Sequence, residues 1–363
     1  MRLLCGRQGI ERAYIPRLLF VSLTTLLTSP LRLWEWIRYG RAIKKTAIHP
    51  SPIFIIGHWR SGTTHLHNLM CRDKNLGYLS TFQAMAPGFC IVGDKRIKRA
   101  LAAMARRRYP TRLIDNIPLT FDAPQEDEFA LATLSPYSFV HAFTFPKEAA
   151  SFFAHYVVFE GISAAVRATW IRTYLAILRK ATFQSGGRRL VSKNCGHSAR
   201  IRTLLKLFPD AKFIFIHRNP YEVFLSTVHM HKTVIPRSQL QDADPDQIEA
   251  RVLQFYQQLM QRYLADRSLI PEGNLVEIGY DDLEASPVDQ VRHVYEALDL
   301  PGFEAAEPEF RLYIESVSDY KKNAYEMTDD IVATVNAHWQ VAFDAWGYEQ
   351  LEAAPRIPGY KGG

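Results

Sequence analysis

Cysteine is scarce in this sequence, and the few cysteines that it has form no recognisable pattern. The 363 residues contain four, with no CxxC pair among them: Cys5, Cys71, Cys90 and Cys195. Disulfide-stapled domains are much denser in cysteine, so we expect free thiols and a reducing, cytoplasmic compartment. The 12 histidines are scattered and no HExxH motif occurs. We therefore expect no metal site.

A long apolar run is missing from the N-terminal region. The uncharged stretch from Leu18 to Leu31 covers only 14 residues, whereas a helix that spans a bilayer needs roughly 20. No small-residue cleavage site follows before Trp34, so a secretory signal fits poorly. Residues 1–48 carry nine Lys or Arg against two acids, interleaved with Leu, Phe and Trp. This pattern predicts a helical segment on a membrane surface, or helices that simply pack on the domain.

Acidic residues are outnumbered, and the formal net charge is +7. Such a charge suggests an anionic partner without identifying it. The strongest local excess lies in residues 94–112, which hold eight Lys or Arg against Asp94 alone. We expect either a solvated helix face or a surface for an anionic lipid or substrate.

Four short strand-like runs, each followed by a helical pattern, divide the chain from residue 51 onward: 53–56, 190–192, 212–216 and 275–278. Strands that alternate with helices predict an α/β fold, a central parallel sheet with helices on both faces. Residues 113–185 show helical periodicity and are expected to form a helical insertion that shapes a binding site. We expect a basic amphipathic segment over 1–48, followed by one domain over 49–363.

The first strand-like run leads into a glycine-containing loop, Gly57 to Thr64, which we call the anion loop. At a strand-to-helix turn, backbone N–H groups and the helix dipole form a cradle for a phosphate-sized anion. The loop has the GxxxxG spacing of a P-loop, but Thr63 stands where nucleoside-triphosphate P-loops place lysine. Phosphoryl transfer with magnesium is therefore a poor fit. The cation lies within the loop instead, as Arg60.

This loop resembles that of sulfotransferases that use 3'-phosphoadenosine 5'-phosphosulfate (PAPS), in which Lys or Arg precedes Ser-Gly-Thr-Thr. A second signature of that family, a strand that ends in Arg with a Ser eight residues later, is matched by Arg218 and Ser226. The resemblance covers roughly residues 50–350. It implies the P-loop-like sulfotransferase fold and transfer of a sulfuryl group from PAPS to a hydroxyl, which yields 3'-phosphoadenosine 5'-phosphate (PAP) and a sulfate ester.

The resemblance also implies a role for each matched residue. Arg60 would lie on the bridging oxygen of the phosphosulfate, and Arg218 with Ser226 would bind the 3'-phosphate of the nucleotide. Tyr280 matches a family tyrosine that approaches the nucleotide, and Lys321 or Lys322 would stand in for a basic C-terminal loop. The expected nucleotide-binding residues are Arg60, Ser61, Gly62, Thr63, Thr64, Arg218, Ser226, Tyr280 and Lys322. The donor needs no divalent ion, and no nucleic acid partner is expected.

In-line sulfuryl transfer needs charge neutralisation on the leaving phosphate and a base for the acceptor hydroxyl. Besides Arg60, we expect Lys193 as the second cation, because it ends a strand of the same sheet. His197 is the first candidate for the base and Glu128, in the acidic run 126–128, is the second. A helix start that satisfies its own dipole also explains Glu128. Three other histidines stay open as bases: His58, His65 and His141.

Several alternatives remain at this stage. The acceptor is a lipid-like alcohol, a carbohydrate or a phenol, with the aromatic insertion and the basic N-terminus favouring the first. A membrane-associated nucleotide-binding protein without turnover is the second reading of the chain. A P-loop kinase or hydrolase is the third, and the lysine missing from the anion loop argues against it.

Overall fold

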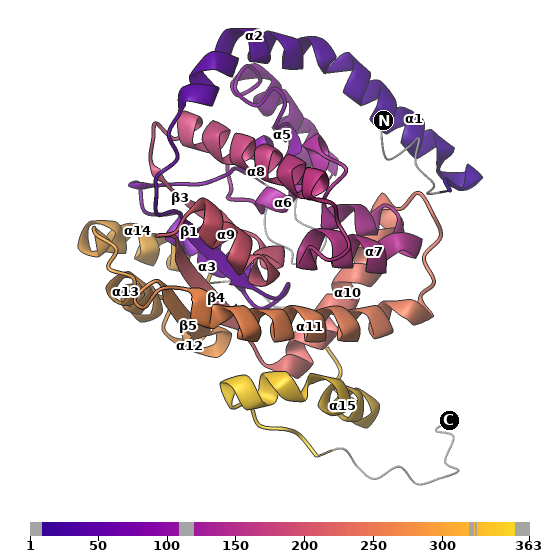
Figure 1. Ribbon diagram of the computed structural model, residues 1–363, viewed down its shortest axis with the longest axis vertical. Helices are drawn as coiled ribbons and strands as arrows, with labels where there is room; N and C mark the ends of the chain where they lie inside the picture. The colour runs from indigo at the N-terminus through magenta and orange to yellow at the C-terminus, as the bar shows by residue number, and fades with distance from the viewer. Residues whose placement is uncertain (1–8, 109–119, 319–322, 324, 353–363) are drawn as a thin grey trace.

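The computed structural model describes residues 9–108, 120–318, 323 and 325–352. Its centre is a five-stranded parallel sheet in the order β2-β3-β1-β4-β5 (Figure 1). The strands are β1 (Ile53–Gly57), β2 (Leu76–Gly77), β3 (Arg189–Lys193), β4 (Lys212–His217) and β5 (Leu275–Gly279). Central β1 lies between β3, with Ile53 opposite Val191, and β4, with Gly57 opposite Ile216. The predicted parallel sheet and four of its strands are confirmed. Only the two-residue edge strand β2 was not predicted.

Helices cover both faces of the sheet, as predicted. One face packs on α3 (Thr63–Met70), α12 (Tyr280–Ala285), α13 (Pro287–Ala297) and α14 (Phe303–Ser316). The other face packs on α9 (Ile201–Leu207), α10 (Pro220–Ser238), α11 (Asp246–Asp266) and α15 (Asp329–Trp346). Alternate residues of β1 enter the two cores, Phe54 and Ile56 on one side and Ile53 and Ile55 on the other. Burial of both faces explains why the strand reads as a continuous apolar run.

The described part of the expected insertion is helical. It contains α6 (Asp127–Leu134), α7 (Ala149–Phe153) and the long α8 (Ala164–Gln184), with the short helical turns η2 (Phe139–Phe143), η3 (Pro146–Glu148) and η4 (Ala154–Val158). Before it come α4 (Thr81–Met85) and the basic α5 (Arg96–Arg108). Three more turns are η1 (Arg12–Tyr14), η5 (Cys195–Ala199) and η6 (Arg267–Leu269). Tyr174 and Trp170 of α8 are fully buried, so the insertion is part of the main core.

The N-terminal arm consists of α1 (Ile15–Leu27) and α2 (Ser29–Lys45) and curves over one end of the molecule (Figure 1). At its start, Arg17 donates to the carbonyl of Gln239 at 2.5 Å. In α2, the buried Glu35 accepts from the N–H of Ile91 at 2.6 Å and from Lys180 Nζ at 2.5 Å. The arm is therefore held against the domain at both of these places.

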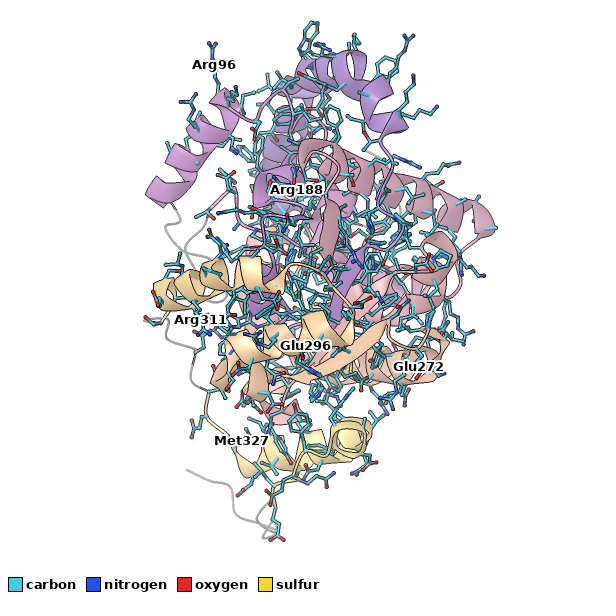
Figure 2. All side chains as sticks on the ribbon, turned by 90° about the vertical axis from the view of Figure 1, so that its left-hand side faces the viewer. Arg96, Arg188, Glu272, Glu296, Arg311 and Met327 are labelled. Carbon is cyan, nitrogen blue, oxygen red and sulfur yellow. The ribbon has the colours of Figure 1, made fainter. Side chains whose placement is uncertain are left out.

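Helical structure extends well beyond the uncharged run on which the argument against a membrane-spanning helix rested. It covers Arg12–Lys45, 34 residues whose best window has a mean hydropathy of 1.2. By length and composition alone, this helix would be able to cross a membrane, although an N-terminal signal sequence passes the same test. The 14-residue uncharged run therefore understates the length of helix that could enter a membrane. Basic α5 lies at the same end as the arm, where Figure 2 shows Arg96 projecting outward.

Candidate active site

The carboxyl ends of four parallel strands supply the candidate site. The anion loop follows β1, Lys193 ends β3, Arg218 follows β4 and Tyr280 follows β5. Ligands of parallel α/β sheets bind at this edge, because the loops that follow adjacent strands meet there. The sequence prediction placed its main residues at these ends, and the structure brings them together.

Two glycines of the anion loop cannot be replaced by a residue with a side chain without moving their neighbours. Gly57 has φ +144°, and a Cβ there would lie 2.4 Å from the carbonyl oxygen of Ile216. Gly62 has φ +93°, and its Cβ would lie 2.2 Å from the ring of Tyr280. Arg60 itself has φ 71°, a left-handed conformation that costs energy for a residue with a Cβ. The loop is thus shaped around a close backbone turn that begins α3, with first-turn N–H groups available for an anion.

The two family signatures meet at the nucleotide end of the site. Arg60 Nε donates to Ser226 Oγ at 2.9 Å, and Arg218 Nη1 donates to the carbonyl of Arg60 at 3.4 Å. The Arg218 guanidinium lies 4.3 Å from the ring centroid of Tyr280. Arg218 Nε also donates to Glu222 at 2.8 Å. Two arginines 158 positions apart in the sequence therefore form one cationic group beside the loop.

Tyr325 belongs to the same place and was not predicted. Its hydroxyl lies 3.3 Å from Ser226 Oγ and 3.2 Å from the side-chain nitrogen of Asn323. The basic loop expected from Lys321 and Lys322 lies outside the described residues. In the sequence, the only indication of Tyr325 was its position just after these two lysines, and no motif spacing identified it as a site residue.

On the acceptor side, Lys193 and Glu126 form a nearly buried ion pair. Lys193 Nζ donates to Glu126 Oε2 at 2.7 Å, and each side chain is 7% exposed. The N–H of Cys195 donates to Glu126 Oε1 at 3.4 Å. Cys195 Sγ lies 3.6 Å from Thr63 Oγ1, so this pair borders the anion loop. Burial, and to a smaller extent the negative charge of Glu126, raise the pKa of Cys195 to about 12. The positive charges of Lys193 and Arg60 oppose this increase.

Glu126 was missed as a candidate for the base because three acids follow one another in the sequence. The backbone of Glu126 is extended and helix α6 starts at Asp127. The three carboxylates therefore point to three different partners. Glu126 contacts Lys193, Asp127 contacts Ser192 at 2.5 Å, and Glu128 contacts Arg200 at 2.8 Å.

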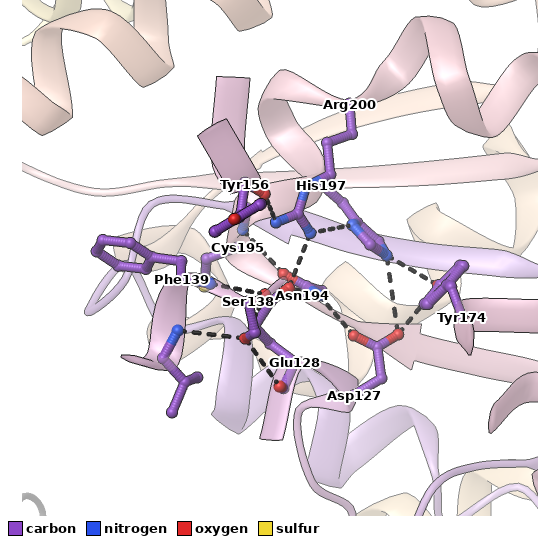
Figure 3. A network of polar contacts seen from close by, with 12 residues as sticks. Asp127, Glu128, Ser138, Phe139, Tyr156, Tyr174, Asn194, Cys195, His197 and Arg200 are labelled. Atoms are coloured by element: carbon purple, nitrogen blue, oxygen red, sulfur yellow. Dashed lines mark hydrogen bonds and ion pairs between the residues drawn. The ribbon is translucent and has the colours of Figure 1, made fainter. Parts of the chain in front are cut away.

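His197 lies in a separate buried network (Figure 3). Its Nε2 is 2.8 Å from the Tyr174 hydroxyl and its Nδ1 is 3.2 Å from Arg200 Nη1. Arginine only donates, so Nδ1 accepts and Nε2 carries the proton. Tyr174 in turn donates to Asp127 at 3.0 Å. Burial, and then the Arg200 charge, keep the pKa of His197 well below its ordinary value.

This geometry argues against the prediction that His197 is the base. The ring is 0% exposed, and its one lone pair faces a guanidinium rather than the anion loop. The 3-10 turn η5, which begins directly after Asn194, holds His197 among buried residues.

Glu128 is held in the same network and is also poorly placed to act as a base. Besides Arg200, it accepts from Asn194 at 2.8 Å and from Ser138 at 2.8 Å (Figure 3). Burial is the largest single influence and opposes ionisation, but the charge and hydrogen bond of Arg200, together with the hydrogen bonds of Asn194 and Ser138, outweigh it and lower the pKa of Glu128. Removal of either partner of such a buried pair would leave an uncompensated charge. Glu128 therefore has the contacts of a structural residue.

The remaining histidines are also engaged elsewhere. His58 Nδ1 lies 2.7 Å from the carbonyl of Trp59, and burial lowers its pKa to about 3. His141 Nε2 lies 2.9 Å from the carbonyl of Ser135. Burial lowers the pKa of His65, whose ring lies 6.4 Å from that of Tyr313. Within the described residues, no cluster of three or more His, Cys, Asp or Glu has the arrangement of a metal site.

Comparison with known proteins gives a consistent result. The "Sulfotransferase family" model matches residues 52–305. An omega-hydroxy-beta-dihydromenaquinone-9 sulfotransferase, Stf3, of Mycobacterium bovis is 32% identical over 334 residues, which cover 91% of this chain and 84% of that protein. The Mycobacterium tuberculosis protein of the same name matches equally.

Two solved structures share the fold. The sulfotransferase STF1 of Mycobacterium tuberculosis has a TM-score of 0.70 at 19% identity, over 92% of this chain and 88% of that chain. STF9 of Mycobacterium avium has a TM-score of 0.70 at 19% identity, over 88% of this chain and 82% of that chain. The resemblance seen in the sequence is thereby confirmed, and the chain belongs to the sulfotransferase family.

Proposed function

We propose that this enzyme transfers the sulfuryl group of PAPS to the hydroxyl of a lipid-like alcohol. One observation carries the donor assignment: Arg218, which follows β4, and Ser226 of α10 both contact Arg60 of the anion loop. These residues fit an adenine nucleotide with phosphate groups at two positions. The loop cradle would hold the 5'-phosphosulfate, and Arg218 with Ser226 would hold the 3'-phosphate.

When bound, PAPS supplies a sulfur atom whose bond to the phosphate oxygen breaks as a bond to the acceptor oxygen forms. Arg60 and Lys193 hold positive charge where negative charge increases on the leaving phosphate. Glu126 is the base that we propose, since it borders the anion loop and its side chain keeps an exposed fraction of 7%, whereas His197 is fully buried. Its carboxylate takes the acceptor proton, while Lys193 keeps it oriented through the 2.7 Å contact.

Two observations favour a lipid-like acceptor over a carbohydrate or a phenol. The relatives that share 32% identity are named for action on a hydroxylated menaquinone, an isoprenoid quinone. The N-terminal arm exposes many large apolar side chains, among them Leu19, Phe20, Leu23 and Leu26. Extracts of host lipids, incubated with labelled PAPS and analysed by mass spectrometry, should yield a sulfated lipid. Sulfation of glycans or small phenols alone would contradict this assignment.

Arg218→Ala should weaken PAP binding by about 2–4 kcal/mol, roughly 30- to 1000-fold in Kd. The side chain bridges the anion loop and the ring of Tyr280, so its loss removes a charge at the 3'-phosphate. Calorimetry measures the change with PAP and with adenosine 5'-phosphate. Glu222→Gln is the matched control, because Glu222 competes for the same guanidinium and its neutralisation should not weaken PAP binding. Equal losses for both nucleotides would refute contact with the 3'-phosphate.

We also propose that the arm and α5 bind the surface of an anionic membrane. Exposed cations on these helices accompany the apolar side chains: Arg38, Arg41, Lys44, Lys45, Arg96 and Arg99. Each contributes about 1 kcal/mol near an anionic surface. The contacts of Arg17 and Glu35 hold the arm along the domain, which supports binding in the plane of the membrane rather than across it.

Leu23→Glu combined with Leu26→Glu should reduce binding to vesicles of mixed phosphatidylcholine and phosphatidylglycerol by more than about tenfold. Each leucine loses the transfer free energy of an apolar side chain, about 1.5–3 kcal/mol when fully buried. Sedimentation with the vesicles measures the effect. Leu269→Glu, an exposed leucine of η6, is the control. Equal binding of all three proteins, or binding that is independent of salt and of the anionic lipid, would contradict the proposal.

A further inference from the structure

A cavity of about 320 Å³ lies between α2, α4 and α8, and its lining includes none of the charged residues of the active site. Most of its lining is apolar and includes Trp36, Ile43, Leu79, Leu134 and Ile177. Pockets for small molecules start at about 300 Å³ and are mostly apolar. The cavity therefore has the size and chemistry of a binding site for a hydrocarbon group.

Two of the charged side chains on its wall, Glu35 and Lys180, form an ion pair with each other. Glu35 accepts from Lys180 Nζ at 2.5 Å and from two backbone N–H groups, those of Ile91 at 2.6 Å and Val92 at 3.0 Å. Gln83 donates to Gln184 at 2.7 Å. A sugar in this cavity would lose hydration of its hydroxyl groups, and the mostly apolar lining offers few partners in return. An aliphatic or isoprenoid chain has no hydroxyl groups along its length and therefore loses no such hydration.

The inner wall of the cavity is continuous with the segment that holds the proposed base. The N–H of Gln125 donates to the carbonyl of Leu79 at 2.8 Å, and Gln125 directly precedes Glu126. Leu134, another lining residue, ends the helix that begins after Glu126. Thus one wall of the cavity and the Glu126–Lys193 pair belong to neighbouring parts of the same segment.

The outer wall of the cavity is the N-terminal arm. Trp36 lines the cavity and is also 71% exposed, on a helix with other exposed apolar side chains. Glu35 fixes α2 at this place through its contacts with residues 91 and 92. The cavity therefore lies between an apolar outer surface and the catalytic segment.

We infer that this cavity binds the apolar chain of the acceptor alcohol and so sets the preference of the enzyme for long-chain substrates. The inference rests on the proposed function and makes it more specific. The chain lies under α2, with its hydroxyl-bearing end directed toward Glu126. Long isoprenoid or alkyl alcohols are then favoured over short alcohols with the same reacting group.

Ala176→Trp tests the inference by filling the cavity. Ala176 lines the cavity but is itself exposed, so the larger side chain displaces no core residue. Ala168→Trp places the same side chain at another exposed position of α8, outside the lining. Farnesol and prenol provide a long and a short acceptor with the same allylic hydroxyl. KM and kcat are measured for both alcohols, and equilibrium binding is measured with radiolabelled farnesol.

We expect Ala176→Trp to weaken farnesol binding and to raise its KM at least tenfold, with prenol turnover and PAP affinity unchanged. Ala168→Trp should match the wild type in every measurement. Gly40→Leu repeats the test from the opposite wall if Ala176→Trp is unstable, since a Cβ at Gly40 meets only ordinary contacts, at 3.4 Å from Trp36. Farnesol binding that survives in both filled variants would overturn the chain site.

The outcome separates this inference from the proposed function. Loss of farnesol binding in Ala176→Trp supports the chain site even if the wild type transfers no sulfate to any alcohol. That second result would instead refute the proposed reaction. Turnover of farnesol with unchanged KM in the filled variants would support the reaction and refute the chain site.

Discussion

Arg60→Ala should lower kcat by ~10²–10³-fold, the range for loss of one preorganised group that stabilises transition-state charge. Arg60 is held in the anion loop by its 2.9 Å hydrogen bond to Ser226, so its charge is in place before the reaction. The effect should appear mainly in kcat, because the charge on the leaving phosphate increases as the bond to sulfur breaks. Initial rates at saturating PAPS and acceptor measure it.

Two control variants separate charge from conformation. Arg60→Lys keeps the positive charge and should retain partial activity. Arg60→Gly removes the charge but relieves the left-handed backbone at φ 71°, so its unfolding midpoint should not fall below that of the wild type. A rate for Arg60→Ala within tenfold of the wild type would show that the loop cation has no role in the chemistry.

The fold and the nucleotide end of the site were predictable because their signals are local. The Ile-rich run of β1 is buried on both faces, and such a run identifies a strand of a parallel sheet without knowledge of its neighbours. Arg60, Arg218 and Ser226 were identified by their resemblance to two short sulfotransferase signatures. The rule that ligands bind at the carboxyl ends of parallel strands then placed these signatures at one edge of the sheet.

The acceptor end was not predictable, because its side-chain directions depend on long-range packing. Whether Glu126, Asp127 or Glu128 points at the anion loop depends on where α6 begins and on which group lies opposite. Arg200 forms an ion pair with Glu128, and the hydroxyl groups of Ser192 and Tyr174 donate to Asp127. No sequence pattern assigns these partners. The 3-10 turn after Asn194 likewise decides that His197 points into the core.

The apolar cavity could not be derived from the sequence either. Its walls come from the N-terminal arm, α4, the end of α6 and α8, and the sequence showed only their periodicity. The sequence indicated a basic amphipathic arm, but the buried contact of Glu35 with residues 91 and 92 places that arm over the cavity. In the sequence, Glu35 is one of only two acidic residues among nine Lys or Arg in residues 1–48, and nothing indicated that it holds the arm in place.

The proposed base gives the second large effect. Glu126→Gln should lower kcat by ~10²–10⁴-fold, the usual contribution of a general base. Glutamine has the same shape, and its one carbonyl oxygen can still accept from Lys193, but it gives up the second acceptor that faces the N–H of Cys195 and it cannot take the acceptor proton. The unfolding midpoint shows whether the variant remains folded, and single-turnover rates show whether the loss lies in the chemical step.

Glu128→Gln and His197→Gln should behave in the opposite way. Each disturbs the buried network and should lower the stability of the protein, by about 3–5 kcal/mol where the buried pair with Arg200 is broken. Each should leave kcat of the folded protein within about tenfold of the wild type. Because burial and Arg200 keep the pKa of His197 well below 6.5, its ring is neutral throughout the range near that pH, and its ionisation produces no rate change there. A rate increase through pH 6.5 that vanishes in His197→Gln but persists in Glu126→Gln would return the role of the base to the histidine.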